Sequence, residues 1–127
     1  MQNDTEAKIR QDLLIEIQTL EQNYRVLSAF LSGTDYDPAT VGSSLQTFKD
    51  SLSRASTYVL ALYNLKGQRV NIPWESLFSS LDYALTTLSV SASVKQRDVV
   101  RTILAMSKEQ MQQVLSYFLA LKESLTN

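Results

Sequence analysis

Residues 65–77, LKGQRVNIPWESL, hold one of the three glycines, one of the two prolines and the only tryptophan of the 127-residue chain. Gly67 stands where the C-terminus of a helix favours a residue in the left-handed conformation. Pro73 fits the first turn of a new helix, where a missing N–H breaks no intrahelical bond. The stretch therefore predicts a corner between two helices, with Trp74 as the first core residue after it.

Apolar residues recur at steps of three and four on both sides of this corner, which is the spacing of one face of an α-helix. In the first three segments the spacing covers residues 9–31, 41–62 and 74–88. No alternating strand pattern competes with it. The sequence predicts an all-α chain with helices over residues 5–32, 38–66, 73–89 and 93–125. In the fourth helix the predicted buried face consists of Val99, Ile103, Met106, Val114, Tyr117, Leu121 and Leu125.

The connections between these helices are short, and the clearest loop is GTDYDPAT at residues 33–40. Short connections favour antiparallel neighbours, and 127 residues are the size of a single domain. We expect residues 1–127 to form one up-down-up-down antiparallel four-helix bundle, with the third helix shorter than the others.

The composition excludes much chemistry, because the chain has no cysteine and no histidine. Disulfides, thiolate nucleophiles, Cys or His metal sites, Ser-His-Asp catalysis and axial His ligation of haem are therefore all ruled out. The sequence contains no Walker loop, no Rossmann glycine pattern and no nucleophile elbow, and no helix offers two inward carboxylates. We expect a protein that is not an enzyme and that needs no cofactor and no metal.

The charges are balanced, since 12 Lys and Arg residues against 13 Asp and Glu give a net charge of -1. This balance offers no electrostatic argument for binding nucleic acid or an anionic membrane surface. The longest apolar run, residues 58–63, is far short of the about 20 residues that cross a bilayer. The N-terminus has no secretory signal, so a cytoplasmic location is the default expectation.

The start of the fourth helix is basic, with Arg97, Arg101 and Lys108 on a shared face. A nucleic-acid surface needs more basic residues than this, and acidic residues lie at the same end of the predicted bundle. We interpret these side chains as solvated charges, partly paired with Asp35 and Asp37.

Three segments are apolar on nearly every face: LLIEI at 13–17, YVLALYNL at 58–65 and VLSYFLAL at 114–121. The predicted topology places them at one end of the molecule, together with Trp74 and Phe78. Either the short third helix covers this end and the outer leucines are ordinary surface residues, or the end forms a homodimer or partner-binding surface. A small-molecule pocket at this end is the third alternative. The interface candidates are Ile15, Leu60, Leu65, Leu115 and Leu119, with Arg69 and Trp74 at the rim.

Gln110 falls in the middle of the predicted apolar face of the fourth helix, with Ser107 beside it. A buried amide must find hydrogen-bond partners, and Tyr24 is expected at about the same height on the first helix. The pair could fix the register of the core. Alternatively Tyr24, Met106 and Gln110 could line a ligand cavity, or Gln110 could simply be exposed.

The sequence therefore predicts a non-enzymatic helical-bundle protein that acts through protein–protein interaction, as an adaptor, accessory or inhibitor-like protein. We expect it to associate with itself, as a homodimer, through its apolar end. The alternative is a bundle that binds a small apolar or amphipathic ligand. We expect no nucleic-acid partner and no membrane span.

Overall fold

The computed structural model describes residues 2–33, 38–69, 74–90 and 94–126 and contains the four predicted helices. The described residues include no strand, so the predicted all-α class is confirmed. α3 has 16 residues whereas the others have 28 to 33, as expected. The predicted helix starts at residues 73 and 93 lie outside the described residues. The helices are α1 (Gln2–Leu31), α2 (Pro38–Leu65), α3 (Glu75–Val90) and α4 (Val94–Thr126).

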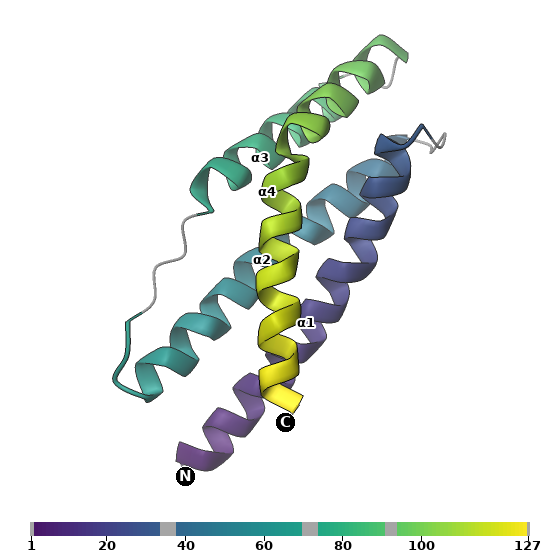
Figure 1. Cartoon of the computed structure of the whole chain (residues 1–127). Helices are drawn as coiled ribbons and strands as arrows, with labels where there is room; N and C mark the ends of the chain where they lie inside the picture. The colour runs from purple at the N-terminus through teal and green to yellow at the C-terminus, as the bar shows by residue number, and fades with distance from the viewer. Residues whose placement is uncertain (1, 34–37, 70–73, 91–93, 127) are drawn as a thin grey trace.

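Each helix packs against the next one in the chain, and α4 closes the bundle against α1. α1 and α2 share the most extensive contact and lie side by side along most of their lengths (Figure 1). α1 begins and α4 ends at the same end of the molecule, as the up-down-up-down order requires (Figure 1). None of the helices, over the residues described, is apolar enough for long enough to cross a bilayer.

A single cluster of buried apolar side chains from all four helices forms the core. The predicted face of α1, and that of α3 as far as Leu85, lie in this cluster or against it. The predicted face of α2 is entirely buried, because these apolar residues recur at steps of three and four along one side of the whole helix. These residues are Val41, Leu45, Phe48, Leu52, Ala55, Val59 and Leu62.

In α4 the predicted face is confirmed from Val114 onward and wrong at Val99 and Met106. Val99 is 39% exposed and Met106 is 81% exposed, while their neighbours turn inward. Adjacent apolar residues at 99–100 and 103–104 allow either of two faces. The face that the protein buries consists of Val100, Leu104, Ser107, Met111, Val114 and Phe118.

The choice between the two faces of α4 follows from the polar residue that each would bury. The observed face buries Ser107, whose hydroxyl donates to the carbonyl of Ile103 in its own helix at 3.1 Å. The predicted face would bury Gln110, whose amide has two donor hydrogens and an acceptor to satisfy. Burying the small, internally bonded hydroxyl costs less free energy.

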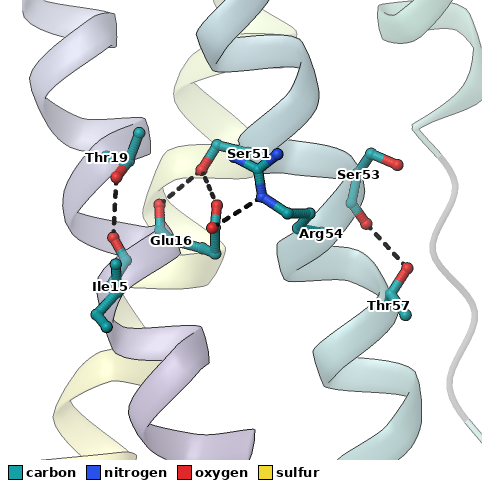
Figure 2. Close-up of polar contacts among 7 residues, drawn as sticks. All are labelled: Ile15, Glu16, Thr19, Ser51, Ser53, Arg54 and Thr57. Atoms are coloured by element: carbon teal, nitrogen blue, oxygen red, sulfur yellow. Dashed lines mark hydrogen bonds and ion pairs between the residues drawn. The ribbon is translucent and has the colours of Figure 1, made fainter.

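A polar cluster joins the midpoints of α1 and α2 (Figure 2). The Ser51 hydroxyl is fully buried and lies 2.7 Å from a carboxylate oxygen of Glu16 and 2.9 Å from the Glu16 carbonyl oxygen. Arg54 donates its Nε hydrogen to the other carboxylate oxygen at 2.9 Å. The Glu16 side chain is only 13% exposed, so these bonds fix the height at which the two helices face each other.

Two helix ends are closed by specific groups. At the end of α2, Gly67 has a φ of 69°, and Gln68 donates to the Tyr63 carbonyl at 2.9 Å, which confirms the predicted glycine cap. At the end of α1, Arg101 of α4 donates to the Phe30 carbonyl at 3.0 Å and lies 4.4 Å from the centre of the Phe30 ring. The interpretation of Arg101 as a merely solvated charge is therefore wrong; Asp35 and Asp37 lie outside the described residues.

The Glu16 cluster predicts a matched pair of effects on stability. Ser51→Ala should lower the free energy of unfolding by about 1.5 kcal/mol relative to Ser53→Ala, because it removes a buried donor from a carboxylate. Ser53 is exposed on the same helix, and both changes gain the same helix propensity. Urea unfolding followed by circular dichroism measures the difference. Equal stability of the two variants would contradict a stabilising role for the cluster.

Candidate functional site

The short α3 leaves one end of the molecule with three helices. Lys49 of α2 forms an ion pair with Asp82 of α3. Because α3 runs antiparallel to α2, its first residue, Glu75, lies level with about residue 56 of α2. Residues 57–65 of α2 therefore extend about 13 Å beyond α3, at about 1.5 Å per residue.

The packing of Trp74 on α4 gives the same boundary. The Trp74 ring lies 5.5 Å from the Tyr117 ring and 5.2 Å from the Phe118 ring. Residues 119–126 of α4 follow this contact and extend about 12 Å beyond it. We call the part beyond α3 the three-helix end; it comprises residues 4–12 of α1, 57–65 of α2 and 119–126 of α4.

Leu60 lies on the side of α2 that a longer α3 would cover. It follows Lys49 by three helical turns, so it shares the side of α2 that faces Asp82. Its side chain is 41% exposed, and Leu65 at the end of α2 is 37% exposed. α3 does not reach this part of α2, but the exposure of Leu60 agrees both with an ordinary surface leucine and with a residue of a partner-binding surface.

A small pocket of about 160 Å³ opens between α2 and α4 at the three-helix end. Leucines of both helices and Tyr63 give it an apolar wall, and Arg10 and Lys66 add positive charge. Arg10 is held by Glu6 at 2.8 Å. The pocket is therefore lined from α1, α2 and α4, at the end that α3 does not reach. The leucines are Leu62, Leu121 and Leu125.

Aromatic side chains lie at the boundary between α3 and the three-helix end. Trp74 packs against the core, as predicted, and Tyr117 and Phe118 meet edge to face with their centres 5.3 Å apart. Tyr63 of α2 lies close to Tyr117 of α4. Burial, together with the Tyr63 phenol, raises the pKa of Tyr117 above its ordinary value.

The predicted interface residues do not gather on one surface, and even Leu60 and Leu65 point about 140° apart around α2. Ile15 is 56% exposed but lies about a turn nearer the middle of α1. Leu115 and Leu119 are partly buried against the core. Leu115 follows Arg101 by four turns and so lies on the side of α4 that faces α1. Arg69 is exposed just beyond α2.

Gln110 is exposed, so the prediction that it is a buried partner of Tyr24 is wrong. Its amide donates to the Ser76 hydroxyl at 3.1 Å and ties α4 to α3. Gln110 and Met106 line an open groove of about 680 Å³ between these helices. Tyr24 packs against the core and is not part of this lining, so the predicted cavity is not formed by all three residues.

No protein-family model, curated protein or solved structure matches the chain. The described residues include no group of three or more acidic side chains that could hold a metal ion. Two surfaces of this chain are therefore the candidate functional sites: the three-helix end and the groove between α3 and α4.

The raised pKa of Tyr117 predicts a late-ionising tyrosine among the six in the chain. Absorbance at 295 nm during an alkaline titration should show one phenol that ionises after the others. Tyr117→Phe should remove this component, whereas Tyr83→Phe, at a 63% exposed position, should keep it.

The same shift fixes the sign of the pH effect on stability. Because the folded-state pKa is the higher one, the contribution of Tyr117 is complete below about pH 10 and is lost as the pH rises through the folded-state value. In the 295 nm titration, a late-ionising phenol that is still present in Tyr117→Phe would belong to another tyrosine.

Proposed function

We propose that the protein is a non-enzymatic helical bundle that acts through protein–protein contact and forms a homodimer through its three-helix end. The observation that carries the proposal is the apolar position left open beyond α3. There the exposed Leu60 lies on the side of α2 that α3 covers elsewhere, and apolar residues of α2 and α4 line a pocket.

A four-helix bundle encloses its core with all four helices. Where only three helices are present, a helix of a second copy can complete the cross-section and remove leucine and tyrosine surface from water. A twofold axis brings the same patch of both copies together, so one apolar patch serves both sides. Leu60, Leu65, Tyr63 and Leu121 are the residues that we expect at this interface.

Molar mass in solution tests the proposal. Size exclusion with light scattering should give twice 14.3 kDa for the wild-type chain at high concentration. Leu60→Glu should shift the mass to that of a single chain, because a buried carboxylate without a partner is costly. Circular dichroism should show unchanged helicity, since Leu60 is already 41% exposed in one copy.

Gln22→Glu provides the matched control, because it adds the same charge at an exposed position of α1 outside the three-helix end. It should leave the mass at twice 14.3 kDa. A single-chain mass for the wild type at every concentration would overturn the dimer proposal. Unfolding by Leu60→Glu would instead place Leu60 in the core.

The small-ligand alternative is a second proposal, supported only by the groove that Met106 and Gln110 line. Its open shape encloses little of a small molecule, which argues for a protein contact instead. A thermal-shift screen against apolar and amphipathic compounds tests it, because a ligand that binds only the folded state raises the melting temperature. No shift across a broad screen would contradict it.

A further inference from the structure

The pocket between α2 and α4 at the three-helix end is a small space bordered by three helices. Its lining comes from α1, α2 and α4 and from the residues that follow α2, and its volume is about 160 Å³. An apolar cavity of about 150 Å³ in a protein interior holds a molecule of the size of benzene. The pocket therefore has room for a small molecule, but not for a helix or a peptide.

The lining of the pocket has an apolar part and a basic part. Leu62 is buried, and Leu121 and Leu125 pack against the core, so the three leucines form an apolar floor. The charged residues among the described members of the lining are Arg10 and Lys66, and both are cations. The remaining members can each donate a hydrogen bond: Tyr63, Gln68 and Ser124. The lining thus suits a molecule with an apolar body and an anionic group.

Arg10 can bind an anion although Glu6 already engages it. The Glu6 carboxylate accepts a hydrogen bond from one terminal nitrogen of the guanidinium at 2.8 Å. A guanidinium has five N–H donors, so others remain for a second acceptor. Glu6 is not part of the lining, and its bond restrains the Arg10 side chain. Because this ion pair has no net charge, the positive charge of the pocket comes from Lys66.

Lys66 brings a charge that no described acidic side chain compensates by an ion pair. The carbonyls at the end of α2 do not need its ammonium either. Those of Tyr63 and Asn64 accept hydrogen bonds from the backbone N–H groups of residues 66–68. A ligand with a single negative charge would therefore neutralise this side of the pocket.

We propose that this pocket binds a small organic carboxylate with an apolar body of about six carbon atoms. The carboxylate lies toward Lys66 and Arg10, and the body packs on the leucine floor. A cationic ligand of the same size would meet two bases instead. All residues of the lining belong to one copy of the chain, so this proposal does not rest on the proposed homodimer.

Hexanoate and hexylammonium test the proposal, because they share an apolar chain and differ in the sign of their charge. Backbone amide chemical shifts of the wild-type chain report the binding of each. Hexanoate should shift residues 62–68 and 121–125 saturably, with a Kd on the order of 1 mM, since a ligand of about eight non-hydrogen atoms makes few contacts. Hexylammonium should bind at least about tenfold more weakly.

Variants at exposed positions locate the binding site without threatening the core. Lys66→Gln should weaken hexanoate binding about threefold, because it removes the uncompensated charge. Lys8→Gln is the matched control: it removes the same charge from a side chain of α1 that is 79% exposed and outside the lining, and it should leave the Kd unchanged. Ser124→Leu fills the pocket without a change of charge and should weaken binding at least about tenfold.

Three results would overturn the proposal: shifts that grow with hexanoate concentration without saturation, equal affinity for hexanoate and hexylammonium, or a Kd that Ser124→Leu does not alter. Leu60→Glu, outside the lining, should retain hexanoate binding. Loss of binding in that variant, with helicity retained, would place the site between two copies and also overturn the proposal. A single-chain mass of the wild type would overturn the homodimer alone.

Discussion

The length of α3 is the constraint on which the surface of this protein depends. α1, α2 and α4 are long enough to form a bundle of full height, whereas the shorter α3 covers only the part of the bundle that lies away from the two chain ends (Figure 1). The rings of Trp74, Tyr117 and Phe118 fix where this cover begins. Beyond them the core is flanked by three helices, and apolar side chains that a fourth helix would bury remain accessible.

The remaining three helices hold their places through contacts that do not involve α3. The Glu16 cluster sets the height of α1 against α2 at their midpoints, and Arg101 closes the end of α1 with a bond to the Phe30 carbonyl. Tyr63 of α2 and Tyr117 of α4 lie close together where these two helices meet. These contacts allow the three-helix end to be structured while it stays exposed.

Sequence periodicity predicted the fold and the core of three helices, because each has one dominant apolar stripe. On α4 it was wrong for Val99 and Met106, because adjacent pairs such as Val99 and Val100 allow two faces. The burial cost of Ser107 against that of Gln110 decides between these faces. The Glu16 cluster was also missed, although Ser44 and Ser51 stand two turns apart beside the buried stripe of α2 and hint at polar contacts there. Of the predicted interface residues, Leu60 and Leu65 lie at the open end, whereas Leu115 is partly buried towards α1. The spacing of apolar residues indicates which residues share a helix face, but not which neighbouring helix that face contacts.

The measurement that tests this account most directly is a map of backbone amide chemical shifts against protein concentration. If the open position beyond α3 is filled by a second copy, the shifts that change should cluster in residues 57–65 of α2 and 119–126 of α4. The amides of α3 and of the groove around Met106 should stay constant. Shifts that do not depend on concentration, or that change around Met106 instead, would contradict the central claim that the short α3 creates the self-association surface.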